Sequence, residues 1–519
     1  MRISLTGDLT HPWAEIIEYG HHSQPRPSTD RLDTCCPGEP SSPQFVPRSK
    51  RVVAMTLATI PEYNPEQTQR LGDRAIVAGG SMAGLVTARV LSDYFGSVMV
   101  IEADEYPDDP VPRRGVPQGT QVHALQESGR ATLEALFEGY TDDLLAAGGV
   151  EMDSASDLLL YSQSGFLADG TEQIPGYTAT RPLVEDVTRR RLEAVEGVEF
   201  RTGCRVVDYS CDGSTVDGVV LRDGPGETTH LPAEFVVDAT GRTSVTPDWL
   251  ERNGYAAPPV EKVDIDVGYS TVTVERSLDE EWGVLATAEA PRTRGGVAFP
   301  VEDDCWQLNF HGVHGDHPPG DVDGLVEFAS TLPVPHLERL LRERRVMSEV
   351  SQYPFPSSRR QYYERLDDFP EGFAVVGDAI ASFNPVYGQG MSVAALDALE
   401  LHHALAAGLA GIGPRFFERA SDVVDTVWSL AVGADAQFAQ TTASVSPVND
   451  LFARYLARFT RRSHSDPALR SAYMRVLSME QPPQALLRPG LLARVLTPRA
   501  ISGRVSDAES PSPFGGADA

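Results

Sequence analysis

The 519-residue sequence predicts an α/β fold with a Rossmann-like nucleotide-binding domain, an inserted antiparallel-sheet domain and a helical C-terminal region. Three observations lead to this prediction. Residues 74–107 have the strand–helix–strand pattern of a βαβ unit, residues 255–355 consist mainly of β-rich runs, and residues 401–500 have a helical pattern throughout. A βαβ unit requires a parallel sheet, whereas successive short strands favour an antiparallel one.

The nucleotide-binding domain opens with the strand "RAIVAGG", the helix "MAGLVTARVLSDYF" and the strand "SVMVIEADEYP". Later patterns predict a helix at residues 124–148, short strands at 158–167 and a second helix at 181–195. A meander is predicted at residues 198–224 and an apolar strand at 234–242.

The domain boundaries follow from these elements. We assign the nucleotide-binding domain to residues 73–157, 180–254 and 356–400, and the antiparallel-sheet domain to residues 158–179 and 255–355. Residues 1–72 and 501–519 are rich in Pro, Ser and Asp and are expected to be a disordered leader and tail.

The composition excludes several classes of protein. The net charge is −30, and Lys50 and Lys262 are the only lysines, which argues against nucleic-acid binding. This balance is typical of halophilic proteins, although a GC-rich genome also favours arginine over lysine. The five cysteines are scattered without paired C-x-x-C motifs, so we expect no disulfide framework, no metal site and a cytoplasmic location. The sequence contains no run of eighteen apolar residues, so we expect no membrane-spanning helix, and we expect no signal peptide.

The turn "GGSMAG" between the first strand and helix predicts a dinucleotide site. Gly79 and Gly84 match G-x-G-x-x-G, and Ser81 replaces the middle glycine. Such a turn lets a pyrophosphate approach the backbone and lets the helix pack closely on the strand. Glu102, at the end of the second strand, can accept hydrogen bonds from ribose hydroxyls. A carboxylate there favours FAD or NAD over NADP.

The stretch "AVVGDAIASFNPVYGQGMS" predicts the second half of the same site. Asp378 follows a strand and can face a polyol, and Pro385 can lie beside a planar ring. Gly388 and Gly390 expose backbone N–H groups at a helix N-terminus, whose dipole favours negative charge. An ordinary strand–loop–helix connection is the alternative interpretation.

Three stretches together resemble the FAD-dependent oxidoreductases of the aromatic-hydroxylase branch, which have the glutathione-reductase-like fold. They are "RRGVPQGTQVHAL" (113–125), "VVDATGR" (236–242) and "PEGFAVVGDAIASFNPVYGQGMS" (370–392). Within that branch the sequence is most similar to polyether-antibiotic epoxidases and their uncharacterised relatives. The resemblance covers roughly residues 73–400 and implies a three-layer ββα FAD-binding domain.

The resemblance implies bound FAD held by residues from both halves of the site. Arg113 or Arg114 and Arg181 would lie near the cofactor, although an exposed or salt-bridged arginine is the alternative at each position. The full set of expected FAD-binding residues is Gly79, Gly80, Ser81, Ala83, Gly84, Glu102, Arg113, Arg114, Arg181, Asp378, Pro385, Gly388, Gly390 and Met391.

The sequence departs from the family at two places. "DATGR" stands where aromatic hydroxylases carry a D-G motif tied to NAD(P)H use, and Ala381 or Ser382 replaces a histidine usually found after G-D-A-A. The electrons can therefore come either from NAD(P)H directly or from a partner flavin reductase.

The predicted reaction is epoxidation or hydroxylation of an apolar, unsaturated small molecule by O2 through a flavin C4a-hydroperoxide. Such chemistry needs no dedicated acid–base pair, and His123 is only a weak catalytic candidate. Tyr269, Phe299 and Phe310 are expected to line the substrate site.

Three further alternatives stay open. The first is a prenyl reductase of the geranylgeranyl type, and the second is a non-catalytic flavin-binding or electron-carrier protein. The third concerns location: the arginines of residues 453–464 allow association with a membrane surface.

Overall fold

The computed structural model describes residues 56–224, 226–443 and 447–497. Most of the predicted disordered leader and the whole predicted tail lie outside these residues. The leader prediction is wrong for residues 56–72. There Ile60 is buried, and the Leu57 N–H donates to the carbonyl of Met479 at 3.2 Å. A few apolar anchors in a Pro-rich segment are enough to hold it against the helices.

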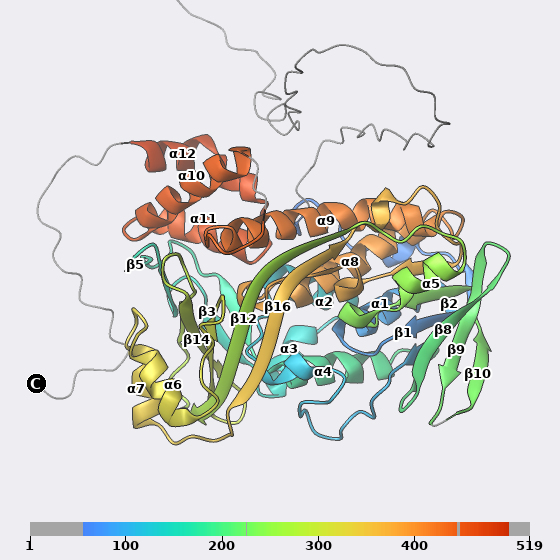
Figure 1. Ribbon diagram of the computed structural model, residues 1–519, viewed down its shortest axis with the longest axis horizontal. Helices are drawn as coiled ribbons and strands as arrows, with labels where there is room; N and C mark the ends of the chain where they lie inside the picture. The colour runs from blue at the N-terminus through green and yellow to red at the C-terminus, as the bar shows by residue number, and fades with distance from the viewer. Residues whose placement is uncertain (1–55, 225, 444–446, 498–519) are drawn as a thin grey trace, which may run out of the picture. The chain divides into compact units, whose positions relative to one another are not determined.

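A five-stranded parallel sheet is the centre of the nucleotide-binding domain (Figure 1). Its strand order is β17 (Phe373–Val375), β11 (Phe235–Asp238), β1 (Gly72–Ala78), β2 (Phe95–Ile101) and β7 (Val198–Arg201). The last four residues of β1 are fully buried, as expected for a parallel strand covered on both faces. Sequence patterning assigned β7 to a meander, but this strand pairs in parallel with β2.

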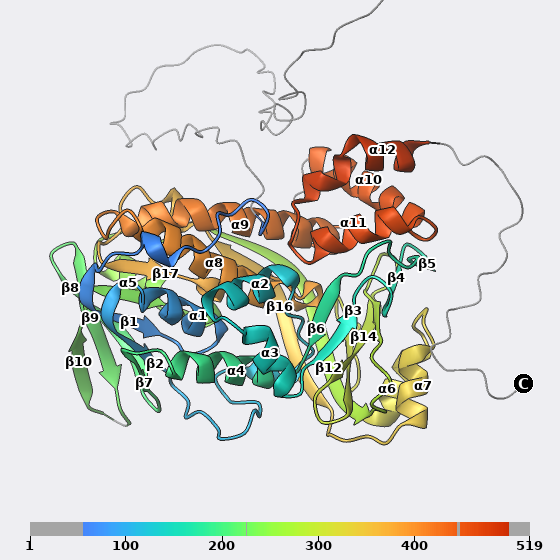
Figure 2. The same ribbon diagram turned by 180° about the vertical axis from the view of Figure 1, so that it is seen from behind.

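Helices cover one face of this sheet and a small antiparallel sheet covers the other (Figures 1 and 2). The helical layer contains α1 (Met82–Leu91), α2 (Glu127–Leu136), α4 (Arg181–Glu193) and α8 (Gly390–Leu405). The small sheet contains β8 (Arg205–Asp212), β9 (Thr215–Arg222) and β10 (Thr228–Pro232), and α5 (Thr246–Arg252) follows β11. This is the three-layer ββα arrangement expected from the sequence.

The single helix expected at residues 124–148 is instead two helices, α2 and α3 (Tyr140–Ala146). Gly139 separates them with φ of 81°, a left-handed conformation that an α-helix cannot contain.

The second domain is an eight-stranded mixed sheet. Its strand order is β18 (Ala381–Ser382), β16 (Ser351–Gln361), β12 (Val260–Glu275), β15 (Cys305–Gly312), β14 (Arg294–Val301), β13 (Gly283–Ala286), β4 (Leu158–Ser162) and β5 (Gly165–Phe166). All neighbours pair antiparallel except β13 and β4. A separate two-stranded sheet consists of β3 (Val150–Asp153) and β6 (Pro175–Thr178), which flank β4 and β5 in the sequence. Because β18 immediately precedes the loop at Pro385, this sheet reaches the predicted cofactor loop.

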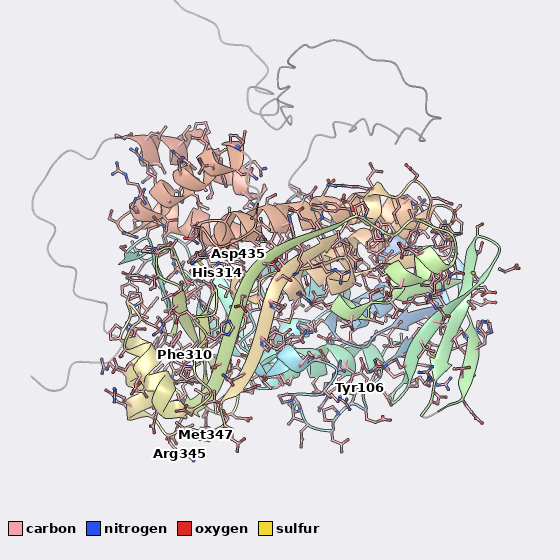
Figure 3. All side chains as sticks on the ribbon, in the orientation of Figure 1. Tyr106, Phe310, His314, Arg345, Met347 and Asp435 are labelled. Carbon is pink, nitrogen blue, oxygen red and sulfur yellow. The ribbon has the colours of Figure 1, made fainter. Side chains whose placement is uncertain are left out.

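The two faces of the eight-stranded sheet have different partners. Val272, Trp306 and Phe310 point to one face and pack with α6 (Val322–Ala329) and α7 (His336–Glu343). The opposite face carries Tyr269 and its cross-strand partner His311. The expectation that Phe310 lines a substrate site is therefore wrong, because side chains alternate along a strand. Figure 3 shows Phe310 beside α6 and α7.

The C-terminal region is helical, with α9 (Ile412–Asp435), α10 (Pro447–Ser463), α11 (Pro467–Leu477) and α12 (Pro489–Leu496). Two α10 arginines bind carbonyls at the end of α12: Arg458 donates to Val495 O at 3.0 Å and Arg462 to Thr497 O at 2.7 Å. Among the helices described, none combines the length and apolar character needed to cross a bilayer.

Replacement of Phe310 by Ala is expected to destabilise the sheet–helix core without disturbing a ligand. Phe310 is fully buried and its ring lies 6.1 Å from that of Phe328. Losing a buried aromatic side chain costs about 3–5 kcal/mol. Thermal unfolding should show a lower midpoint, while the flavin content of the protein that stays folded is unchanged. Selective loss of flavin from folded Phe310→Ala protein would contradict this orientation.

Two glycines with the same backbone conformation allow a matched test of the contact between α1 and the turn that follows β17. Gly377 (φ 64°) would place a Cβ 2.7 Å from the Cβ of Ala83, whereas Gly213 (φ 63°) has no atom within 4 Å of its Cβ position. Both Ala substitutions carry the left-handed strain of roughly 1–2 kcal/mol, but only Gly377→Ala adds a clash. We therefore expect a clearly larger drop in the unfolding midpoint for Gly377→Ala. Equal drops would show that this contact does not constrain the fold.

Candidate cofactor site

Three parallel strands end side by side at the carboxyl edge of the central sheet. Ala78 of β1 is in register with Asp238 of β11, which in turn is in register with Val375 of β17. The turn Gly79–Ser81, the segment Ala239–Ser244 and the pair Gly377–Asp378 therefore emerge together. In open α/β sheets, ligands bind in the crevice beyond these strand ends.

The first turn satisfies the steric demands of a dinucleotide fold. Gly79 has φ of 106° and its N–H donates to Ile101 O at 2.8 Å. A Cβ on Gly84 would lie 1.8 Å from Gly79 O, so only glycine lets α1 begin this close to β1. Ala83 contacts the turn at Gly377, so the two predicted halves of the site touch.

Glu102 is buried beside this turn. Its Oε2 accepts from the Gly80 N–H at 2.8 Å and its Oε1 from the Asp104 N–H at 3.0 Å. The Tyr106 hydroxyl donates to Gly80 O at 2.7 Å and closes the turn from the other side. The carboxylate is thus fixed at the end of β2, where the sequence places it for ribose recognition.

Ser81 and two arginines meet at a buried carboxylate, Glu185 of α4. The Ser81 hydroxyl donates to Glu185 at 2.7 Å and accepts from Arg181 at 2.8 Å. Arg113 pairs with Glu185 at 2.7 Å and with Glu102 at 3.2 Å. Burial alone would raise the pKa of Glu185, but Arg181 and Arg113 hold it below its ordinary value. Arg181 and Arg113 are therefore salt-bridged next to the turn, while Arg114 is exposed and lies outside this cluster.

The second half of the site begins at Gly377, whose N–H donates to Asp397 of α8 at 3.2 Å. Burial raises the pKa of Asp397 to about 7. Asp378 is exposed, and desolvation by neighbouring protein atoms raises its pKa against the attraction of Arg181 and Arg242. Its carboxylate is therefore accessible to a ligand at this edge of the sheet.

The loop from Pro385 to Gly390 leads into α8. Pro385 is exposed, and Gly388 has φ of 64° and would place a Cβ 3.3 Å from Ala124. Gly390, the first residue of α8, is exposed and has no atom within 4 Å of its Cβ position, whereas Met391 and most later residues of the helix are buried. Only the N-terminal end of this buried helix is therefore open, and it can stabilise negative charge.

His123 lies in the loop between the arginine cluster and α2. Its Nδ1 is 2.8 Å from Gln121 O, and burial together with Arg181 lowers its pKa to about 4. The imidazole is therefore neutral at physiological pH. It remains a weak candidate for proton transfer, and its observed partner is the backbone of its own loop.

Sequence reasoning missed Glu185, Tyr106 and Arg242. Glu185 follows Arg181 by one helical turn in "RPLVE", a spacing that indicates an ion pair but not its burial. Arg242 donates to the Ser382 hydroxyl at 2.8 Å and to Ser357 O at 2.7 Å, joining the end of β11 to the eight-stranded sheet. Such contacts between distant segments have no local sequence signal.

The residues present fit FAD. The glycines at 79 and 84 meet the steric demands of a dinucleotide-binding turn, and no atom lies within 4 Å of the Cβ position at Gly390, where a ring would bind. Glu102 and Asp378 would offer carboxylates to the ribose and ribityl hydroxyls. When bound, FAD supplies redox chemistry that no protein side chain can supply.

Comparison with known proteins gives the same cofactor. Residues 74–416 match the family described as FAD binding domain. Protein Rv3254 of Mycobacterium tuberculosis is 32% identical over 438 residues, covering 79% of this chain and 91% of that protein. Kynurenine 3-monooxygenase of Salinispora tropica is 24% identical and covers 65% of this chain and 74% of that protein.

The flavin-dependent brominase Bmp2 has the same fold, with a TM-score of 0.56, 18% identity and coverage of 79% of this chain and 94% of that one. The fold, the glycine turn and the sequence family agree. The chain therefore belongs to the FAD-binding domain family of aromatic-hydroxylase-type flavin monooxygenases, and it is an FAD-dependent enzyme.

Proposed function

We propose that this enzyme transfers one oxygen atom from O2 to an unsaturated, largely apolar small molecule, as an epoxidase or a hydroxylase. The observation that carries the proposal is the open N-terminus of α8 at Gly390, next to the edge where β18 brings the eight-stranded sheet to the same loop. A flavin ring at this loop would face the sheet, and a substrate would bind between them.

The inner face of the sheet supports an apolar substrate with some polar contacts. Tyr269, Phe355 and Phe438 form an apolar cluster that reaches Val386 of the loop. Farther along the face, Asn309 donates to Thr271 at 2.7 Å, and Thr271 donates to Gln121 at 2.8 Å. These buried polar groups satisfy one another, so they place no charge in the site.

The protein's own residues would position the reaction. The loop Pro385–Gly390 would orient the ring, and the α8 N-terminus would stabilise the negative charge of its reduced form. The electrons would come from NAD(P)H or from a partner flavin reductase in the cytoplasm.

Isotope labelling tests the reaction. The purified enzyme is reduced anaerobically and mixed with 18O2 and a panel of polyprenyl alcohols and polyunsaturated lipids. The proposal predicts products that carry one 18O atom, formed with uptake of O2. Saturated products formed without O2 uptake would contradict it and identify a prenyl reductase. Flavin reoxidation that no member of the panel changes would favour a non-catalytic flavoprotein.

Two glycines at helix N-termini test the position of the ring. Gly390 of α8 and Gly490 of α12 both have open space around their Cβ positions, and an aspartate near a helix N-terminus is stabilising. Gly390→Asp is expected to weaken FAD binding by at least about tenfold, because the new side chain would occupy the space of the ring. Gly490→Asp should bind FAD as the wild type does. Equal FAD dissociation constants in both variants, measured by fluorescence titration, would exclude the ring from this loop.

A further inference from the structure

Asp435 is a buried carboxylate that hydrogen-bonds to the loop predicted to hold the flavin ring, but it lies outside the range that matches the family. It is the last residue of α9, is 1% exposed, and lies beyond residues 74–416 that match the family. Its Oδ1 accepts from the Tyr387 hydroxyl at 2.8 Å and from Asn384 Nδ2 at 2.9 Å. Figure 3 shows Asp435 where the end of α9 meets the eight-stranded sheet, near His314.

These contacts extend from the loop to the substrate sheet. Asn384 Oδ1 accepts from the Tyr269 hydroxyl at 2.9 Å and from the Val386 N–H at 3.2 Å, and the Val386 N–H also lies 3.1 Å from the Tyr269 oxygen. The loop is thus held between α9 on one side and β12 on the other.

The negative charge on Asp435 destabilises the folded protein, and the hydrogen bonds that Asp435 accepts do not require a charge. Its Oδ2 is buried and has no hydrogen-bond partner among the described residues, and the C-terminal end of α9 is unfavourable for negative charge. Burial raises its pKa to about 6. An asparagine could accept the same two hydrogen bonds through its amide oxygen and would carry no charge. A buried charge that destabilises the fold, at a position where a neutral side chain of the same shape would suffice, points to a functional role.

The groups that face Asp435 are few. Tyr387 and Tyr269 are the titratable side chains beside it in the loop and in β12, and Tyr473 faces Tyr387 from α11. His314, labelled near Asp435 in Figure 3, bonds to Thr441 at 3.1 Å, and burial lowers its pKa against the attraction of Asp266. In the described part of the chain, Asp435 forms no ion pair with an arginine or lysine.

We propose that Asp435 is a positioning residue for the flavin ring: it fixes the Pro385–Gly388 turn through Tyr387 and Asn384, and its negative charge opposes reduction of the ring. The inference rests on the assignment of the ring to this loop. The α8 N-terminus favours the reduced, anionic ring, and Asp435 balances that preference. The C-terminal helices thereby adjust the redox behaviour of a cofactor held by the rest of the chain.

Four variants test this role. Asp435→Asn keeps the acceptor and removes the charge, Asp435→Ala removes both, and Tyr387→Phe removes one donor. Asp425→Asn is the matched control, because Asp425 is another α9 carboxylate but pairs with Arg360 away from the loop. The measurements are the FAD midpoint potential, the FAD dissociation constant, and the unfolding midpoint of the apoprotein between pH 5 and 8.

In Asp435→Asn we expect a more positive FAD midpoint potential at pH 8, because a negative charge near the anionic reduced ring is lost. A carboxyl whose pKa rises from 3.8 to about 6 on folding destabilises the protein as the pH rises through that interval. The Asp435→Asn apoprotein should therefore lack that contribution and should unfold at a higher temperature than the wild type at pH 8.

Asp435→Ala and Tyr387→Phe should weaken FAD binding, the former by about tenfold, and Asp425→Asn should leave the potential and the FAD dissociation constant unchanged.

A wild-type potential in Asp435→Asn would overturn the inference, and so would equal shifts in Asp435→Asn and Asp425→Asn. If Asp435→Ala does not fold, Asp435→Asn still gives the decisive value. The two proposals also fail separately. A wild-type FAD affinity in Gly390→Asp would show that the ring does not bind at this loop. Weakened FAD binding in Gly390→Asp, together with an unchanged potential in Asp435→Asn, would reject only the role of Asp435.

Discussion

The close approach of backbone segments at the carboxyl edge of the central sheet is the constraint on which the rest of the structure depends. Gly84 lies so close to the Gly79 carbonyl that no side chain fits, and Gly377 contacts Ala83 of the same turn. Segments about 300 residues apart are thereby joined at one point. The eight-stranded sheet and the C-terminal helices then have fixed positions relative to the cofactor site, because β18 and Asn384 follow directly from this edge.

Buried charges are distributed unequally along the site. At the proposed adenine end, the carboxylates of Glu102 and Glu185 are balanced by Arg113 and Arg181. At the proposed ring end, Asp397 and Asp435 have no guanidinium partner among the described residues, and burial raises their pKa values to about 7 and about 6. Balanced charges fix geometry, whereas unbalanced ones influence the charge that a bound ligand can adopt.

The sequence was sufficient for the fold, because its strand and helix patterns are local signals, and its resemblance to a flavoprotein family was sufficient for the cofactor. The βαβ pattern located β1, α1 and β2, and Gly-Asp followed by Pro and Gly-x-Gly located the loop before α8. The orientation of Phe310 was missed because both faces of its strand are buried, so alternation of polarity gives no direction. Glu185 and Asp435 were missed because their roles arise only when distant helices pack against the turns.

Backbone hydrogen–deuterium exchange on addition of FAD tests the central claim, that one cofactor spans both halves of the site. Slower exchange is expected in two separate segments, residues 79–84 and 386–392, with no change at the start of α12. Protection confined to residues 79–84 would contradict the claim, because the loop before α8 would then hold no part of FAD.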